Sequence, residues 1–165
     1  MSPVCRVVVL MGSGSDREFG TKIAKHAANL GLTPQLRVCS AHKGTADTLK
    51  LLAELEASPD KVVLIAVAGR SNGLGPVLSG NGTLPVINCP PAENPAEVAQ
   101  DVWSSLRVPS GLGCTTVLYP ESAALAAAQI HALHNHLVWS RLRVKQLTNY
   151  IALKTADVSL RNQKF

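Results

Sequence analysis

Buried apolar runs that alternate with helical patterns constrain the fold of this chain more than any other feature. Residues 4–11 and 61–68 are nearly continuous apolar runs, which is typical of parallel strands covered on both faces. Shorter strands are expected at 36–39, 84–89 and 115–118. Because a helical pattern or loop separates each strand from the next, we predict an α/β fold. It would be a three-layer, doubly wound parallel sheet with right-handed crossovers, Rossmann-like or flavodoxin-like.

Helical patterns fill the segments between these strands and the end of the chain. The expected helices cover residues 17–30, 45–57, 76–79, 96–106 and 121–139, with an interrupted helical pattern over 141–161. Residues 92–95 should form a loop, and Lys164 and Phe165 should fray.

A length of 165 residues suits one domain, with 46% apolar and 16% charged residues indicating a folded protein. We predict a single domain over 1–165, made of a core at 4–136 and a C-terminal helical extension at 137–165. The extension is too apolar to face solvent alone, so we expect it to contact neighbouring subunits. No apolar run reaches the roughly 18–20 residues that span a bilayer, and no signal peptide is evident, so a cytoplasmic location without a membrane partner is expected.

Cysteines and net charge exclude other classes. The four cysteines are widely spaced, without a Cys-x-x-Cys pair, so a disulfide framework or one of the usual zinc sites is not expected. The formal charge of +5 could suggest nucleic acid, but many basic residues lie along the C-terminal helical pattern and no aromatic platform accompanies them. We favour a solvated or subunit-facing helix, and a small anionic substrate fits the remaining charge equally well.

Three polar loops follow the first three strands and should meet at one edge of the sheet. They are Gly12–Asp16, Ser40–Gly44 and Gly69–Gly73. Ligands of open α/β sheets bind outside the carboxyl ends of the strands, so these loops predict one active site. An imidazole at His42 can take and return a proton near neutral pH, and Lys43 adds a fixed positive charge.

Less specific interpretations of these loops stay open. Gly12–Asp16 begins like a dinucleotide fingerprint, but Arg17 stands where glycine is needed, and the acidic residue after the second strand is missing. An NAD site is therefore not expected, whereas anion binding at a helix N-terminus is. A plain turn with a helix cap, and a structural role for His42, are the alternatives.

Two further candidate sites, a histidine metal site and a catalytic triad, are not supported by the sequence. His131, His134 and His136 have no carboxylate at helical spacing among them, so we expect surface or interface histidines and no metal site. No Gly-x-Ser-x-Gly elbow precedes a helix, which argues against a Ser-His-Asp triad.

Taken together, the motifs resemble those of the phosphoribosylaminoimidazole carboxylases of purine biosynthesis. The resemblance rests on residues 11–16 (MGSGSD), 40–43 (SAHK) and 68–75 (AGRSNGLG), and extends through 85–87, 102–107, 109–111 and 137–140. One branch of that family rearranges N5-carboxyaminoimidazole ribonucleotide and typically carries Ala-His-Arg and Gly-Gly-Ala-Ala-His. The other carboxylates 5-aminoimidazole ribonucleotide directly with CO2 and carries Ala-His-Lys and Gly-Arg-Ser-Asn. Lys43 and residues 69–72 resemble the direct branch.

The resemblance implies a role for each loop. The 5′-phosphate and ribose would be held by the residues Gly12, Ser13, Ser15, Asp16, Ser40 and Lys43. CO2 would be placed by the loop residues Gly69, Arg70, Ser71, Asn72 and Gly73. Lys43 would stabilise the forming carboxylate, and His42 would remove the C4 proton of the substrate, returning it in the reverse decarboxylation.

The resemblance also implies partners. It implies no ATP, biotin or metal, and assembly as a homo-octamer. The direct branch includes the C-terminal half of an animal bifunctional enzyme with a succinocarboxamide synthetase domain, so this chain would be a standalone protein or a fragment. Three alternatives remain: the mutase reaction on the same fold, a related carboxylase acting on another mononucleotide, and a non-catalytic nucleotide-binding module. The last predicts that His42 can be replaced without loss of function.

Overall fold

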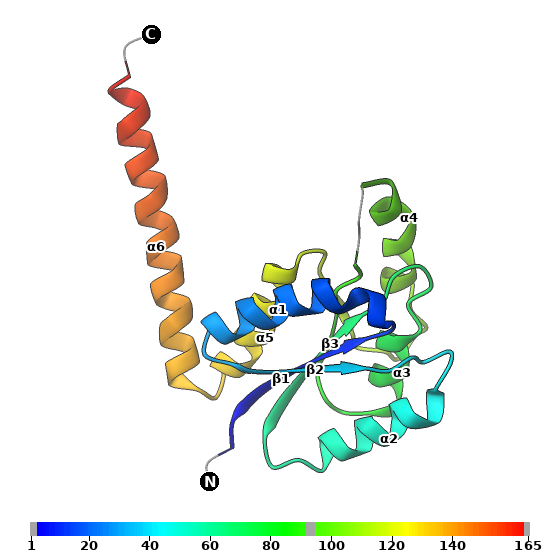
Figure 1. Cartoon of the computed structure of the whole chain (residues 1–165). Coiled ribbons are helices and arrows are strands. Elements are labelled where there is room, and N and C mark those ends of the chain that lie inside the picture. Colours follow the sequence, from blue (N-terminus) through cyan, green and yellow to red (C-terminus); the bar gives the residue numbers. More distant parts are fainter. Residues whose placement is uncertain (1–2, 92–94, 164–165) are drawn as a thin grey trace.

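The computed structural model describes residues 3–91 and 95–163. Its strands form one five-stranded sheet, which lies among the helices (Figure 1). The strands are β1 Cys5–Met11, β2 Thr33–Val38, β3 Lys61–Val67, β4 Val86–Asn88 and β5 Thr115–Thr116. All paired strands are parallel, in the order β2-β1-β3-β4-β5. This is the flavodoxin-like order of doubly wound sheets, so the predicted fold class is confirmed.

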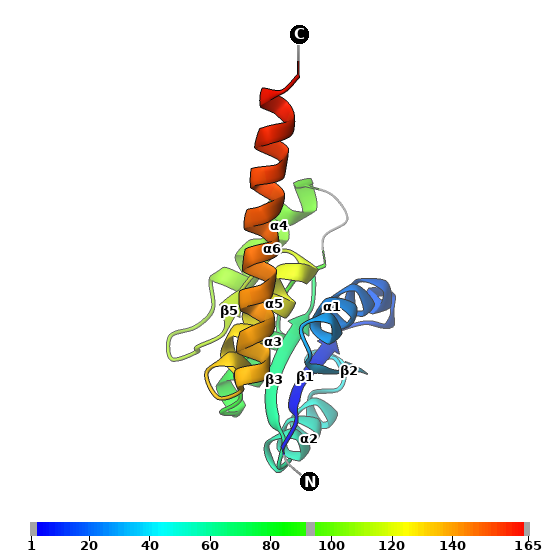
Figure 2. The same cartoon turned by 90° about the vertical axis from the view of Figure 1, so that its left-hand side faces the viewer.

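Helices cover both faces of the sheet. The helices of the described chain are α1 Arg17–Asn29, α2 Thr45–Glu56, α3 Leu74–Asn81, α4 Pro95–Leu106, α5 Pro120–Ala132 and α6 His136–Arg161, with a short 3₁₀ helix η1 at Gly14–Asp16. Helices α1 and α5 pack on one face and α2 and α3 on the other. Most of α6 projects away from the sheet (Figures 1 and 2).

Strand β1 forms the centre of both apolar layers. Val7 and Val9 face α1 and α5, whereas Val8 and Leu10 face α2 and α3. All four side chains are fully buried, and burial of each stabilises the fold by roughly 1.5–3 kcal/mol relative to exposure. Because β1 is covered on both faces, it holds the loop that follows it, Gly12–Asp16, in a fixed position at the edge of the sheet.

Two predicted elements, β2 and α3, are longer than expected. Strand β2 begins at Thr33, three residues before the predicted start, and includes Pro34. Because β2 is an edge strand, the missing N–H of a proline is tolerated there. Helix α3 begins at Leu74 and not at Pro76, since proline is accepted within the first turn of a helix.

The prediction of one continuous helix over 121–139 was wrong at residues 133–135. Helix α5 ends at Ala132, and α6 begins at His136. Asn135 separates them, because its side-chain oxygen accepts hydrogen bonds from the backbone N–H groups of Leu137 at 3.0 Å and Val138 at 3.1 Å. The apolar periodicity continues across this break and concealed the cap.

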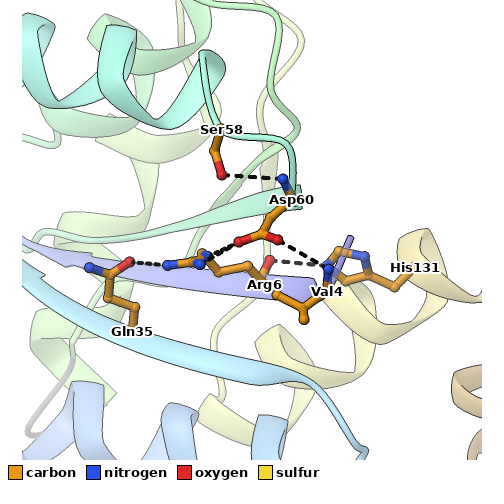
Figure 3. A network of polar contacts seen from close by, with 6 residues as sticks. All are labelled: Val4, Arg6, Gln35, Ser58, Asp60 and His131. Atoms are coloured by element: carbon orange, nitrogen blue, oxygen red, sulfur yellow. Dashed lines mark hydrogen bonds and ion pairs between the residues drawn. The ribbon is translucent and has the colours of Figure 1, made fainter. Parts of the chain in front are cut away.

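A polar network closes the amino end of β1 (Figure 3). The Asp60 carboxylate accepts from the backbone N–H of Val4 at 3.1 Å and from Arg6 Nε at 2.9 Å, and pairs with the Arg6 guanidinium. These contacts, the Val4 bond first, hold the pKa of Asp60 below its usual value. The Nε2 atom of His131 lies 3.1 Å from the Arg6 carbonyl oxygen.

His131 corrects the prediction of a surface or interface histidine, because it is fully buried. Its burial follows from the packing of α5 against β1, which sequence spacing did not reveal. The four cysteines are free, as predicted, and burial raises the pKa of the Cys89 thiol to about 12.

Some predictions fall outside the described residues: most of the predicted loop at 92–95, and the fraying of Lys164 and Phe165. Within the described part of the chain, none of the helices combines the length and the apolar character needed to cross a membrane.

Candidate active site

A cleft of about 1120 Å³ opens at the carboxyl ends of β1, β2 and β3. The three predicted loops meet there. Of the predicted site residues, those that line the cleft are Gly12, Ser13, Ser15, Asp16, Ser40, His42, Lys43, Gly69, Arg70, Ser71 and Gly73. Only Asn72 of the predicted set does not line it.

The first loop presents hydroxyl groups at the start of a helix. The Ser13 hydroxyl accepts from the Ser15 N–H at 3.3 Å and from the Ser15 hydroxyl at 2.9 Å. Asp16 is half-buried beside them, and this burial raises its pKa, while hydrogen bonds with Ser13 and Ser15 offset part of the effect. The exposed serines and the nearby start of α1 suit an anion such as phosphate.

The second loop is a tight turn organised by Ser40. Its hydroxyl accepts from the Lys43 N–H at 3.2 Å, and its carbonyl accepts from the Gly44 N–H at 2.9 Å. These two bonds place His42 and Lys43 at the exposed tip of the turn. An imidazole and an ammonium group are thereby held next to each other at the mouth of the cleft.

The His42 imidazole lies directly against the backbone of the third loop. A Cβ atom at Gly73 would be 2.7 Å from His42 Nε2 and 2.9 Å from Cε1, so a glycine is needed at 73 for this approach. The backbone of Gly73 has φ −81° and ψ −21°, which any residue can adopt. Position 73 therefore requires glycine for space and not for conformation.

The third loop is strained at Arg70 and held by α4. Arg70 has φ 56°, a left-handed conformation that is unfavourable for arginine. Asp101 Oδ2 accepts from the Arg70 N–H at 2.6 Å. The Ser104 hydroxyl donates to the Arg70 carbonyl at 2.7 Å and accepts from the Asn72 N–H at 3.1 Å. Two side chains of α4 thus stabilise the loop in this shape.

Asn72 is turned into the protein interior. Its Nδ2 donates to Asn88 Oδ1 at 2.9 Å and to the Ser105 hydroxyl at 3.0 Å, and its Oδ1 accepts from the Gly75 N–H at 3.1 Å. Both N–H groups of the Asn72 amide and its oxygen therefore bind partners inside the protein, away from the cleft. Asn72 therefore ties the third loop to β4 and α4.

Sequence reasoning missed the contribution of α4 to the cleft. Its cleft-lining residues are Glu97, Gln100, Asp101 and Ser104. Their spacing of three, four and seven residues from the first is that of one helix face, and all four are polar. A search for polar side chains at this spacing could have pointed to α4 as a wall of the site.

The cleft thus combines hydroxyl donors, an exposed ammonium group and an imidazole along the edge of a flavodoxin-like sheet. This arrangement defines an α/β protein that can bind a small anionic ligand and move a proton on it. A sequence model of the AIR carboxylase family matches residues 6–150, and the chain belongs to this family.

Individual relatives agree with this assignment. The chain is 59% identical over 157 residues to the bifunctional phosphoribosylaminoimidazole carboxylase/phosphoribosylaminoimidazole succinocarboxamide synthetase of Homo sapiens, covering 95% of this chain and 37% of that protein. It is 38% identical over 156 residues to the phosphoribosylaminoimidazole carboxylase of Archaeoglobus fulgidus, covering 94% and 85%. The crystal structure of Treponema denticola PurE superposes with a TM-score of 0.90 at 34% identity, covering 95% of this chain and 99% of that one.

The chain spans little more than a third of the length of the animal relatives that it matches. The resemblance derived from the motifs and the predicted fold are both confirmed by these comparisons.

Proposed function

We propose that the protein carboxylates 5-aminoimidazole ribonucleotide with CO2 to give 4-carboxy-5-aminoimidazole ribonucleotide, in de novo synthesis of the purine nucleotide IMP. The reaction is reversible and uses no ATP, biotin or metal. The observation that carries the proposal is the contact of the His42 imidazole with Gly73, which joins a proton acceptor to the loop expected to place CO2. Family membership and the names of the relatives support the substrate.

The first loop supplies the phosphate and ribose site. The hydroxyls of Ser13 and Ser15 donate to the 5′-phosphate, which lies beside the positive N-terminal end of α1. Asp16 accepts from a ribose hydroxyl, and Ser40 and Lys43 complete this wall. The half-buried position of Asp16 beside the two serines suits this role.

The chemical step forms one carbon–carbon bond. The amino group of the substrate makes C4 of its imidazole nucleophilic, and C4 attacks the carbon of CO2. One C=O π pair moves onto oxygen, where the Lys43 ammonium stabilises the forming carboxylate. His42 then takes the C4 proton, and the electrons of that C–H bond restore the aromatic ring.

The third loop positions CO2 mainly through Ser71. The N–H groups of Arg70, Asn72 and Gly73 already donate to acceptors within the protein. The exposed Ser71 hydroxyl is therefore the donor we assign to CO2, with Ala68 and Leu74 as apolar neighbours in the cleft. Gly69 and Arg70 shape this side of the cleft, and Asn72 acts from behind it.

The direct test is to incubate purified protein with 5-aminoimidazole ribonucleotide and bicarbonate without ATP and to follow the ultraviolet absorbance of the carboxylated product. Product formation supports the proposal. Absence of product together with conversion of N5-carboxyaminoimidazole ribonucleotide would identify the mutase instead. Inactivity on both substrates would favour another mononucleotide or a non-catalytic module.

The role of His42 has a matched test. His42→Asn keeps a polar side chain of similar reach but removes the proton acceptor, so substrate should still bind while turnover is lost. Loss of binding and turnover together would show that His42 is structural. A Lys43→Arg variant, which recreates the Ala-His-Arg of the mutase branch, tests whether the ammonium group selects direct carboxylation.

We further propose that the chain is one domain, with a core at 4–136 and an extension at 137–165 that contacts neighbouring subunits in a homo-octamer. The exposed apolar side chains of α6 support this: Leu137, Trp139, Val144, Leu147, Tyr150, Ile151, Leu153, Val158 and Leu160. Removing the residues after Arg141 should reduce the mass in solution measured by light scattering, and an unchanged mass would refute the proposal. We expect action in the cytoplasm, and a synthetase domain in any longer parent protein.

A further inference from the structure

A cluster of metal-binding side chains lies at the end of the sheet opposite the cleft. Cys5 begins β1, and His131 and His134 lie at the end of α5 and just after it. One ligand atom from each of the three residues falls within 4.8 Å of the other two. Strand β1 separates this cluster from the cleft by roughly 20 Å, given about 3.3 Å per residue.

His131 has one nitrogen committed and one unpartnered. Its Nε2 lies 3.1 Å from the Arg6 carbonyl oxygen, which can only accept a hydrogen bond, so Nε2 carries the proton (Figure 3). The other nitrogen, Nδ1, therefore presents a lone pair. It is buried, belongs to a side chain with no exposed surface, and has no hydrogen-bond partner among the described residues.

One committed and one unpartnered ring nitrogen is a feature that His131 shares with metal-binding histidines. Such a histidine usually donates its second ring N–H to a carbonyl or carboxylate, which fixes the tautomer and aims the free nitrogen at the metal. The neighbouring sulfur is held in a similar way, because Asn135 Nδ2 donates to Cys5 Sγ at 3.3 Å. An unpartnered buried nitrogen is otherwise unfavourable, and a metal ion would satisfy it.

We propose that Cys5, His131 and His134 form a binding site for one zinc ion. One sulfur and two imidazole nitrogens are ligands that Zn²⁺ prefers, and three protein ligands leave the fourth tetrahedral position to water. Ligand atoms around tetrahedral zinc are roughly 3.3–3.6 Å apart, given the usual Zn–N and Zn–S lengths. Because the ligand atoms lie within 4.8 Å of one another, the cluster must contract by at most about 1–1.5 Å, and the exposed His134 can make most of that movement. Binding displaces the thiol proton of Cys5.

The site is distinct from the proposed chemistry. It would brace the start of β1 against the end of α5 and would leave the carboxylation step without a metal. Sequence spacing alone did not reveal it, because Cys5 joins the histidines only once the chain is folded.

The test is titration of the metal-free full chain with Zn²⁺ by calorimetry and with Co²⁺ by absorbance. The wild-type protein should bind one equivalent, and Co²⁺ should give a sulfur-to-metal charge-transfer band. His134→Ala should weaken binding by at least the roughly 10- to 100-fold that follows loss of a ligand's hydrogen-bond partner, and Cys5→Ser should abolish the band. His134 is exposed, so His134→Ala should fold normally even if Cys5→Ser does not.

Two variants serve as matched controls. His136→Ala removes a nearby histidine that stacks on Trp139 outside the cluster, and Cys114→Ser removes a cysteine elsewhere. Both should bind zinc like the wild type, and zinc should raise their melting temperature but not that of His134→Ala. Failure of the wild type to bind zinc at micromolar concentration, or equal binding by His134→Ala, would overturn the proposal.

Discussion

The contact between Gly73 and His42 offers a sharp test of the proposed mechanism. In Gly73→Ala, the new Cβ would lie 2.7 Å from His42 Nε2, whereas ordinary contacts begin at 3.4 Å. The imidazole would therefore have to move by about 0.7 Å or rotate away. Misplacement of a catalytic group by about 1 Å can reduce the rate on the order of 100-fold, so we expect kcat to fall by about 10- to 100-fold.

The same substitution should leave the fold intact. Because Gly73 has a backbone conformation that alanine adopts readily and the exposed His42 can move, Gly73→Ala should change the free energy of unfolding by less than about 1 kcal/mol. The KM for the mononucleotide should change little, because the first loop is untouched. Activity would therefore fall without a large loss of stability, a combination that general damage to the structure does not produce.

The assay is steady-state carboxylation with thermal unfolding measured on the same samples. Gly113→Ala is the matched control, since no atom lies within 4 Å of a Cβ built at Gly113, which does not line the cleft. It should retain its kcat. An unchanged kcat in Gly73→Ala would refute the idea that the position of His42 against the third loop matters for turnover.

Three further predictions concern the groups that support the site and the sheet. Asn72→Ala should lower the free energy of unfolding by about 2–4 kcal/mol in urea denaturation, because it leaves buried partners unpaired; a change below about 0.5 kcal/mol would contradict this. Asp101→Ala should reduce kcat/KM by about tenfold with little change in melting temperature, because it removes the acceptor that holds the Arg70 N–H of the strained loop. Full activity would show that this hydrogen bond is not needed to keep the loop in its active shape. Because the pKa of Asp60 is lowered in the folded state, its carboxylate stabilises the fold at pH values above its usual pKa of 3.8. This contribution is lost as the pH falls through the lower, folded-state pKa. Asp60→Asn should therefore make stability less dependent on pH in that acid range, and an unchanged pH profile of unfolding would contradict the assignment.

Local patterns sufficed to predict the parts of the fold that local physics determines. Local sequence determines the apolar strands β1 and β3, and the stop of α1 just before Gly31, whose φ of 81° suits glycine. The three site loops follow from the strand ends. Strand β5 is only two residues long, shorter than the predicted 115–118, so almost nothing in its sequence marks its limits. The cap at Asn135 was concealed by continuous helical periodicity on both sides.

Long-range packing determines what the sequence did not reveal. Asn72 stands in the middle of a polar loop, and nothing nearby shows that its partners would be Asn88 and Ser105. The burial of His131 likewise depends on the placement of α5 beside β1. Both residues are polar groups whose partners are distant in sequence, and the identity of such partners cannot be read from spacing.

The third loop shows why a motif predicts a site better than it predicts the role of each residue. Gly73 leaves space for the imidazole of His42, while Gly75 leaves space for the buried amide of Asn88, which a Cβ at 75 would overlap. Asn72, which directly precedes Gly73, points into the interior, and Ser71 lines the cleft. Residues that line the cleft and residues that hold them in place therefore alternate within one motif. A substitution at Asn72 or Gly75 should act through stability and loop position, whereas one at Ser71 should act on the binding of CO2.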